Sequence, residues 1–421
     1  MKDIIVQKFG GTSLADTDKI KNAANAVIRE KELGNDVIVV VSAMGHTTDY
    51  LIKMAKEISK NPSDREMDML LSTGEGISIA LLTMAIQAKG YSAVSLNAMQ
   101  IGIITEGIHQ KARIIDIKTK RLKENLDKGK IIVVAGFQGI TEEGEITTLG
   151  RGGSDTSAVA LAAALKAKRC DIYTDVEGVY TTDPRIVKNA SKIEAVSYEE
   201  MLELARVGAN VLHPRSVETA KQFNVPMRVR STFNLENLGT LIIGAENMEI
   251  YKPVTGVAAD LSQARIVVCD VPDIPGHAAK LFGALAKENI SVDMIIQSYA
   301  RTKTKTNDIA FTIDKNDLEK TAQVLEKLKT DLNIGTIHID ENIAKISIVG
   351  AGMVDRPGIA ATMFETVANA GINIKMISTS EIKISCLVEK EDAQNALKAL
   401  HKTFELESNE IAKVKGDLPE L

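Results

Sequence analysis

With 421 residues, the chain is long enough for two or three domains. Aromatic residues make up only 4% of it and Trp is absent, so its hydrophobic cores must be largely aliphatic. The formal net charge of −5, without any basic block, argues against nucleic acid as the main partner.

Signals for membranes, export and redox chemistry are weak. No apolar run reaches about 18 residues, so we expect no membrane-spanning segment. A predicted strand begins within four residues of Met1, which leaves no room for a signal peptide. Cys170, Cys269 and Cys386 lie far apart without metal-type spacing and are interpreted as core thiols. We therefore expect a cytoplasmic protein and assign no metal ligands among its side chains.

Residues 1 to about 245 alternate apolar strands with amphipathic helices. Strands are predicted at 4–6, 37–42, 131–135 and 171–174, and helices at 19–33, 76–89, 155–167 and 198–207. Strands that are apolar on both faces and separated by helices predict a parallel sheet covered on both sides. Ligands bind such sheets beyond the carboxyl ends of the strands, where the Gly-rich motifs of this region lie.

An internal repeat follows a change of composition near residues 245–252. Pro275-Gly276 recurs as Pro357-Gly358, at an offset of 82 residues. Five further pairs match at this offset: Ala279 and Ala361, Phe282 and Phe364, Ile290 and Ile372, Val292 and Ile374, Met294 and Met376. Each copy has the order expected of a ferredoxin-like βαββαβ unit. Chance similarity between two amphipathic helices would not produce this many matches around a shared Pro-Gly.

The first Gly-rich motif, residues 8–13 (KFGGTS), follows the first predicted strand. Glycine amides can approach a phosphate closely because no Cβ intervenes, and Lys8 adds a positive charge. A helix beginning near residue 14 would direct its N-terminus at the same place. A strand that merely ends in a tight turn would look similar, so this motif alone leaves both interpretations open.

The second Gly-rich motif, residues 150–155 (GRGGSD), leads into an Ala-rich helix. Ser154 or Asp155 could simply cap that helix. Arg151 between glycines favours a binding role, because a guanidinium on bare backbone can approach a carboxylate or phosphate with two parallel hydrogen bonds.

Two polar residues stand at the borders of apolar segments. Ser42 ends the strand at 37–42 and could bind a substrate or serve only the turn. Glu75 begins an apolar helix, where it could interact with the helix dipole or pair with a substrate ammonium.

The loop after the strand at 171–174 carries an aromatic residue, a carboxylate and a guanidinium: Tyr180, Asp183 and Arg185. Such a set could hold a nucleotide, although turn chemistry explains it equally well. His213-Pro214-Arg215 lacks the context of a nucleophile and is interpreted as the start of a helix, not as a catalytic site.

Taken together, these segments resemble the aspartate kinases of the amino-acid kinase family. The resemblance rests on residues 8–13 (KFGGTS), 39–45 (VVVSAMG), 72–75 (STGE), 150–155 (GRGGSD) and 173–185 (YTDVEGVYTTDPR), and the repeat is similar to two ACT domains. It implies a three-layer αβα kinase domain with a mostly parallel sheet at 1–245. One βαββαβ ACT domain would follow at 264–337, and a second would combine 250–263 with 338–421.

The resemblance implies that ATP and Mg²⁺ phosphorylate the β-carboxyl of L-aspartate, the first step toward lysine, threonine, methionine and isoleucine. Lys8 would stabilise the transferred phosphoryl group, and Asp155 would orient Lys8. The implied substrate site comprises Ser42, Thr47, Glu75, Arg151, Gly152, Gly153 and Ser154. The implied nucleotide site comprises Lys8, Phe9, Gly10, Gly11, Thr174, Asp175, Tyr180, Asp183 and Arg185. Some relatives carry a lysine where this chain has Ser231-Thr232-Phe233, which leaves the contacts near residues 230–233 open.

Twin ACT domains imply feedback inhibition by lysine, threonine or both, without choosing among them. The implied effector residues are Asp273, Gly276, Ala278, Gln297, Asn373, Ile374, Thr379 and Ser380. The assembly is expected to be a homo-oligomer, or an α2β2 complex whose regulatory subunit starts internally at Met248. An ordinary linker methionine is the alternative for Met248.

Two rival functions stay open at this point. Another amino-acid kinase would act on glutamate, acetylglutamate or UMP, but residues 39–45 and 72–75 and the twin ACT repeat argue against it. An amino-acid sensor without catalysis would not need Lys8, Arg151 and Asp155.

Overall fold

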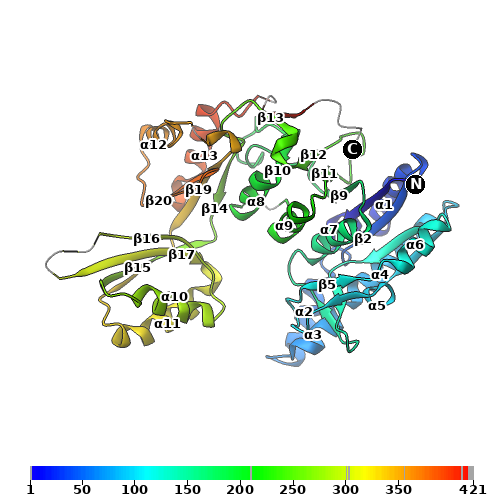
Figure 1. Ribbon diagram of the computed structural model, residues 1–421, viewed down its shortest axis with the longest axis horizontal. Coiled ribbons are helices and arrows are strands. Elements are labelled where there is room, and N and C mark those ends of the chain that lie inside the picture. Colours follow the sequence, from blue (N-terminus) through cyan, green and yellow to red (C-terminus); the bar gives the residue numbers. More distant parts are fainter. Residues whose placement is uncertain are drawn as a thin grey trace. The chain divides into compact units, whose positions relative to one another are not determined.

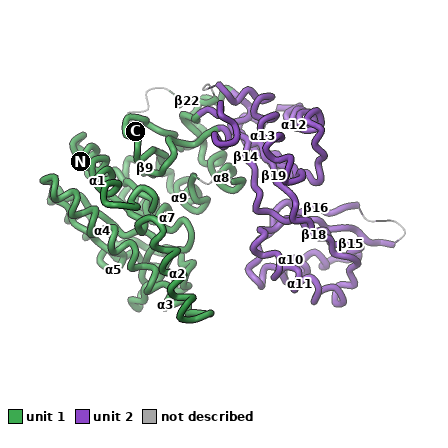
Figure 2. Tube along the Cα trace, turned by 180° about the vertical axis from the view of Figure 1, so that it is seen from behind, with its two compact units in different colours: residues 1–180, 192–251, 409–421 green, residues 181–191, 252–408 purple. Residues whose placement is uncertain are grey.

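The computed structural model describes residues 2–208, 211–299, 301, 304–354, 356–408 and 411–415 (Figure 1). The chain forms two compact units, which Figure 2 shows in different colours. Unit 1 contains residues 1–180, 192–251 and 409–421, and unit 2 contains residues 181–191 and 252–408. Both Gly-rich motifs therefore belong to unit 1, and the internal repeat belongs to unit 2.

Unit 1 is built on an eight-stranded sheet whose pairings are parallel except for that between β11 and β12. The strand order is β10 (Ala195–Ser197), β12 (Thr240–Ile243), β11 (Met227–Ser231), β9 (Arg169–Thr174), β1 (Ile4–Phe9), β2 (Asp36–Val41), β6 (Ile131–Ala135) and β3 (Ala93–Leu96). β1 pairs with β2 on one side and with β9 on the other, so the carboxyl ends of these three strands are level.

Helices cover both faces of this sheet. α1 (Thr17–Glu32) and α4 (Thr73–Gln87) pack together on one face, and α7 (Gly153–Leu165) packs against β1, β2 and β9. Val37, Val39 and Val41 of β2 join the core formed with α1 and α4, while Ile38 and Val40 between them are also fully buried. Because successive residues of a strand point to opposite faces, β2 is covered on both sides. The predicted three-layer arrangement with a mostly parallel sheet is confirmed.

The remaining elements of unit 1 surround the sheet. A second sheet has the order β5 (Ile114–Ile117), β4 (Ile103–Thr105), β7 (Gln138–Ile140), β8 (Ile146–Thr148). The other helices are α2 (Thr47–Ile58), α3 (Asp64–Leu71), α5 (Ala98–Ile101), α6 (Lys120–Asp127), α8 (Tyr198–Arg206) and α9 (Pro214–Phe223). A two-stranded sheet joins β13 (Met248–Ile250) to β22 (Ala412–Val414).

The stretch Asp64–Gln87 is long and apolar enough to cross a membrane by length and composition alone. In the structure it consists of α3 and α4, which meet at Ser72. Ile79, Leu82 and Ile86 of α4 belong to the core of unit 1. The apolar character of α4 is therefore that of a core helix, and Glu75 lies buried within it.

Unit 2 contains two ferredoxin-like halves. The first half has the sheet order β16 (Val292–Gln297), β17 (Thr306–Asp314), β15 (Gln263–Pro272), β18 (Ile337–Asp340), with α10 (His277–Lys287) and α11 (Leu318–Asp331). The second has the order β14 (Gly256–Asp260), β19 (Ile343–Val349), β21 (Lys383–Glu389), β20 (Met376–Thr379), with α12 (Ile359–Asn369) and α13 (Ala393–Thr403). β14 precedes the first half in sequence, but it pairs with β19 at the edge of the second sheet. The predicted βαββαβ order is confirmed in the first half. The second half repeats it as β19, α12, β20, β21 and α13, with β14 in the sheet position that β18 has in the first half.

Two segments differ from the predicted domain limits. Residues 181–191, placed by the sequence in the 1–245 domain, belong to unit 2, because Val257 N donates to Thr181 O (2.8 Å) and Ser191 Oγ donates to Glu407 O (2.6 Å). Ile186 also packs against the core of the second half. Ala412–Val414, predicted within the second ACT domain, pairs instead with β13 of unit 1.

Candidate active site

Several loops meet at the carboxyl edge of the large sheet. Ser42 N donates to Phe9 O (3.1 Å), Gly10 N to Tyr173 O (3.4 Å), and Gly136 N to Val41 O (3.0 Å). These bonds join the ends of β1, β2, β6 and β9 into one surface. This is the edge at which open parallel α/β sheets bind ligands.

An ion pair between Lys8 and Asp155 lies at this edge. Lys8 is on β1 and Asp155 is in the first turn of α7, and Lys8 Nζ lies 2.5 Å from Asp155 Oδ1. Each side chain is only 12% exposed. A Cβ atom at Gly10 would lie 3.5 Å from Lys8 Nζ, so the ammonium is held directly beside the Gly-Gly turn. The structure thus brings together the two residues to which the resemblance assigns catalytic roles.

The first Gly-rich motif is tied to the loops of β2 and β11. Gly45 N donates to Gly11 O (2.9 Å), and a Cβ at Gly11 would lie 2.9 Å from Ala43 O. Only glycine permits this approach of the two backbones. Ser13 Oγ and Thr232 Oγ1 share a hydrogen bond of 2.6 Å. Thr232, part of the segment where the sequence departs from some relatives, thus anchors the turn that follows β1.

Glu75 lies in the first turn of α4 and is only 2% exposed. Its Oε1 accepts a hydrogen bond from Ala43 N (2.9 Å), while Oε2 has no hydrogen-bond partner among the described residues. Burial raises the pKa of the Glu75 carboxyl to about 7, against the lowering effect of the hydrogen bond from Ala43. A buried carboxyl with one free oxygen is suited to receive a cationic group, since an unpaired buried charge is costly.

Thr47 lies beside Gly74, the residue that precedes Glu75. It is the first residue of α2, and its Oγ1 donates to Met44 O (2.6 Å). A Cβ at Gly74 would lie 3.6 Å from Thr47 Cγ2 and 2.8 Å from Ala43 Cβ. The predicted substrate residues Thr47 and Glu75 are therefore brought together beside the end of β2.

The second Gly-rich motif forms a loop that leads into α7. Gly150 and Gly152 have φ values of +76° and +71°, which glycine adopts without strain. The Arg151 guanidinium between them is exposed and forms no hydrogen bond or ion pair with residues that the structure describes. Ser154 is buried, and a Cβ at Gly136 would lie 2.9 Å from its Oγ.

The predicted nucleotide residues are divided by the fold. Thr174 Oγ1 donates to Asp175 Oδ1 (3.0 Å) at the end of β9, and Tyr180 also belongs to unit 1. Asp183 and Arg185 lie in the 181–191 segment of unit 2, where Arg185 Nη2 lies 2.7 Å from Asp183 Oδ2 and the hydrogen bonds from Arg185 lower the pKa of the Asp183 carboxyl.

Phe9, a further predicted nucleotide residue, is fully buried and stacks on Tyr173 with a centroid distance of 4.6 Å. Its side chain therefore packs in the core, and only its backbone lies at the edge of the sheet.

The predicted effector residues lie in unit 2. Gly276 and Gly358 of the repeated Pro-Gly are the N-caps of α10 and α12, with φ values of +96° and +97°. The first group, Asp273, Gly276, Ala278 and Gln297, lies at one end of the first sheet, because Val271 and Gln297 pair with Asn307 and Ile309 of β17. The second group is split: Asn373 and Ile374 precede β20, while Thr379 is the last residue of β20 and Ser380 follows it.

Comparisons with known proteins identify the family. The model described as "Amino acid kinase family" matches residues 3–231, and the one described as "ACT domain" matches residues 266–328 and 346–404. Aspartokinase 2 of Bacillus subtilis is 54% identical over 409 residues, covering 97% of this chain and 99% of that protein. The chain belongs to the amino acid kinase family, among its aspartokinases.

Solved structures of the family agree with this assignment. E. coli aspartokinase III in complex with aspartate and ADP (R-state) has 28% sequence identity and a TM-score of 0.81, covering 95% of this chain and 99% of that chain. The complex of the same enzyme with lysine and aspartate (T-state) has a TM-score of 0.76 at 28% identity and the same coverage.

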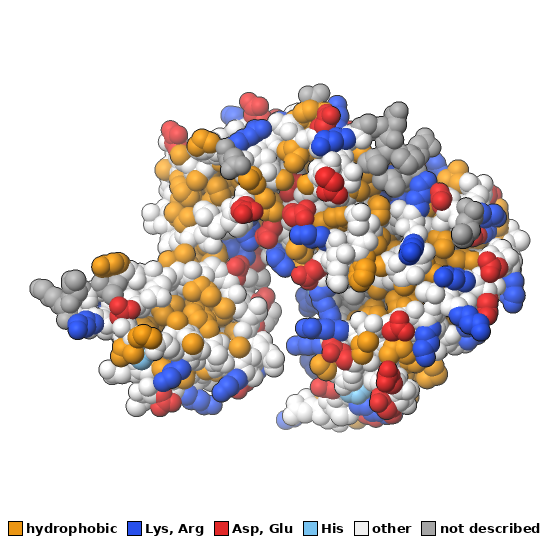
Figure 3. All heavy atoms as spheres, in the orientation of Figure 1, with side chains coloured by type: hydrophobic (Ala, Val, Ile, Leu, Met, Phe, Trp, Pro, Cys, Tyr) orange, Lys and Arg blue, Asp and Glu red, His pale blue; other side chains and the backbone are white. Residues whose placement is uncertain are grey.

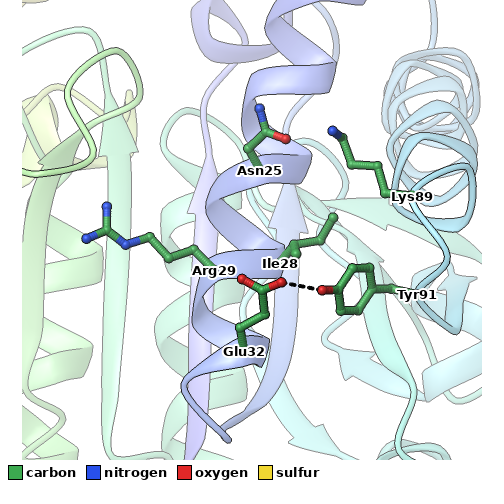
Figure 4. A pocket seen from close by; sticks show the side chains of 6 residues that line it. All are labelled: Asn25, Ile28, Arg29, Glu32, Lys89 and Tyr91. Atoms are coloured by element: carbon green, nitrogen blue, oxygen red, sulfur yellow. Dashed lines mark hydrogen bonds between the residues drawn. The ribbon is translucent and has the colours of Figure 1, made fainter.

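Other surface features lie away from the strand ends. Figure 3 shows Lys, Arg, Asp and Glu side chains interspersed over the visible face of each unit. A depression of about 360 Å³ beside α1 contains none of the predicted site residues, and in it Tyr91 donates to the Glu32 carboxylate (Figure 4). It is lined by Asn25, Ile28, Arg29, Glu32, Lys89 and Tyr91.

Among the described residues, no group of three His, Cys, Asp or Glu side chains is placed to hold a metal ion.

Sequence reasoning missed two supports of the site. Asp68 is fully buried, accepts from Gln110 N (3.1 Å) and lies 2.7 Å from His109 Nδ1, although nothing in its local sequence indicates this role. Arg230 lies over the Tyr173 ring at 5.6 Å. The Arg-x-Arg sequence at 228–230 was the available signal, but only the pairing of β9 with β11 shows what Arg230 contacts.

Proposed function

We propose that this chain uses ATP to phosphorylate the β-carboxylate of L-aspartate, giving 4-phospho-L-aspartate and ADP. The observation that carries the proposal is the Lys8–Asp155 ion pair, held beside Gly10 where the ends of β1, β2 and β9 meet. The aspartokinase relatives, one of them crystallised with aspartate and ADP, support the same reaction.

The reaction brings two anions together. A carboxylate oxygen of aspartate forms a bond to the γ-phosphorus of ATP, and the bond from that phosphorus to the bridging oxygen breaks as ADP leaves. The site must therefore supply positive charge and hydrogen-bond donors. Lys8 supplies the charge on β1, and the N-terminus of α7 adds backbone donors. The attacking carboxylate is already ionised at neutral pH, so Asp155 acts by orienting Lys8 and not as a base.

Recognition of aspartate requires partners for its ammonium and its second carboxylate. The free, buried Oε2 of Glu75 is matched to the ammonium. The exposed guanidinium of Arg151 is matched to the α-carboxylate, which it can bind through two hydrogen bonds. The other proposed contacts are Ser42, Thr47, Gly152, Gly153 and Ser154.

The nucleotide would lie along the ends of β1 and β9. We assign its phosphates to Lys8 and to the backbone of Phe9, Gly10 and Gly11. Mg²⁺ is usually held by one or two carboxylates together with the phosphates, and the exposed carboxylate of Asp175 at the end of β9 fits this requirement. When bound, Mg²⁺ neutralises charge on the phosphates. The remaining proposed nucleotide residues are Thr174, Tyr180, Asp183 and Arg185.

We propose that lysine, threonine or both inhibit the enzyme by binding to unit 2. The inhibited reaction would be the first step toward lysine, threonine, methionine and isoleucine, and it would take place in the cytoplasm. The ACT matches support regulation by amino acids, as does the lysine complex of E. coli aspartokinase III. The assembly is proposed to be a homo-oligomer, or an α2β2 complex with a subunit started at Met248. Met248 itself is buried as the first residue of β13.

The test is ATP- and Mg²⁺-dependent formation of an acyl phosphate from aspartate, trapped with hydroxylamine. Wild type and K8A are compared, each with and without lysine plus threonine. We expect hydroxamate from wild type only, suppressed by the effectors. Hydroxamate that is insensitive to both amino acids would remove the regulatory proposal. Hydroxamate from glutamate but not from aspartate would remove the substrate assignment.

A further inference from the structure

The start of α9 lies against the loop that carries Arg151. His213 is the N-cap of this helix, and its Nδ1 accepts a hydrogen bond from Arg215 N (3.3 Å). Arg215 Nη1 in turn donates to Leu149 O (2.8 Å), directly before the Gly150–Gly153 loop. The first turn of α9 therefore contacts the second Gly-rich motif, although more than 50 residues separate them in sequence.

The closest approach is between Gly152 and the His213 ring. A Cβ at Gly152 would lie 2.2 Å from Cγ and 2.6 Å from Cδ2 of His213, distances that no real Cβ adopts. A Cβ at Gly150 would lie 2.7 Å from Gln110 O. Arg151 thus stands between two glycines that are each in close contact with another segment, and the imidazole of His213 makes one of these two contacts.

The hydrogen bonding of the ring defines its tautomer. Because Nδ1 accepts from Arg215 N, the neutral imidazole carries its proton on Nε2. Burial lowers the pKa of His213, an effect that Arg215 and Arg151 reinforce and Asp155 opposes. A neutral ring keeps Nδ1 available as the helix cap. If Nδ1 were protonated, it and Arg215 N would both be donors, so their hydrogen bond would be lost and the ring would be held less firmly against Gly152.

We propose that His213 is a positioning residue for aspartate: its ring fixes Gly152, and through Gly152 the direction in which Arg151 meets the substrate carboxylate. This inference rests on the proposed function, since the role of Arg151 is part of it. We assign its effect to substrate binding, because the ring contacts Gly152 beside Arg151 and the Lys8–Asp155 ion pair is formed without it.

The test compares H213A and H213N with wild type in the full-length chain. Asn is a favourable N-cap, so H213N keeps the helix start while removing the ring from Gly152. We expect both variants to raise the KM for aspartate by about tenfold or more, with KM for ATP and kcat changed by no more than about threefold. S197A is the matched control, because Ser197 caps α8 in the same unit and its loss should lower stability without changing the KM for aspartate.

A double-mutant cycle with G152A tests the contact itself. With His213 present, the Cβ of G152A clashes with the imidazole ring, and the alanine is also strained by the positive φ at this position. In the H213A background only the strain from the positive φ remains. We therefore expect G152A to raise the KM for aspartate by a larger factor in wild type than in H213A.

Additive effects in the cycle, or H213A and H213N variants with the wild-type KM for aspartate, would overturn the proposal. In either case an active wild type leaves the proposed function standing. A wild type that neither binds nor phosphorylates aspartate would overturn both.

Discussion

The buried carboxyl of Glu75 makes the stability of unit 1 depend on pH in a defined direction. Its folded pKa of about 7 exceeds the unfolded value of 4.5, because burial disfavours the charged form. For such a group the native state holds the proton more tightly, so its contribution to stability is full below pH 4.5 and is lost as the pH rises to about 7. The rise in pKa corresponds to roughly 3 kcal/mol, at about 1.4 kcal/mol per pH unit.

The perturbation is E75Q, which keeps the shape of the side chain and an oxygen for Ala43 N but cannot ionise. Relative to wild type, E75Q should gain roughly 3 kcal/mol of unfolding free energy between pH 4.5 and pH 8, whatever constant offset the new amide introduces. The assay is denaturant unfolding of ligand-free protein across this pH range, with the exposed residue variant E57Q as the control. E57Q should follow the wild-type curve.

The same carboxyl links substrate binding to proton release. If the aspartate ammonium pairs with Glu75, the bound state favours the ionised carboxylate, and wild type should release protons on binding aspartate near pH 7. Calorimetry in buffers of different ionisation enthalpy measures this release, and E75Q should abolish it while raising the KM for aspartate. An E75Q-minus-wild-type stability difference that stays constant between pH 4.5 and 8 would refute the reasoning about burial.

The other predictions concern charge and close packing in unit 1. K8A should lower kcat by about 10²–10³-fold, because Lys8 is the cation at the strand ends, and a steady-state assay measures this; a kcat near wild type would contradict it. G11A should lower the thermal midpoint of unfolding, because a Cβ at residue 11 would clash with the backbone. G76A should raise the free energy of unfolding by up to about 1 kcal/mol, because alanine favours the helix and a Cβ at residue 76 would have no atom within 4 Å. R169L should cost about 3–5 kcal/mol in denaturant unfolding, because it leaves Asp171 buried without its 3.0 Å partner; a loss below about 1 kcal/mol would count against this account.

The sequence predicted the parts of the fold that depend on local pattern. The strand at 37–42 was recognisable because it is apolar on both faces, and the repeat because Pro-Gly recurs with matched helix positions. The strands β10 and β12, at one end of the sheet, were not predicted, since they are short and their burial depends on partners distant in sequence. The assignment of 181–191 to unit 2 depends on contacts with Val257 and Glu407, which no local pattern indicates.

The candidate site was predictable to a similar degree. Lys8 was recognisable because it precedes two glycines at a predicted strand end, whereas the role of Asp155 followed only from the resemblance to aspartate kinases, since its position alone also suited a helix cap. The supporting residues were not, since they act by contact: His213 touches Gly152 through its ring, and Asp68 holds Gln110 N. The sequence predicted that a helix starts at His213, which the structure confirms, but it did not predict the contact of the His213 ring with Gly152.

The path of the chain has a consequence for how its parts can be exchanged. The backbone passes between the two units after residues 180, 191, 251 and 408, so neither unit is a continuous piece of sequence. Consider a chimaera in which a single crossover near residue 250 joins the first half of this chain to the second half of a relative. Its 181–191 segment and β13 would come from this chain, whereas the residue that bonds Thr181 and the strand β22 would come from the relative. Successful recombination should therefore require at least these two contact surfaces to be inherited together.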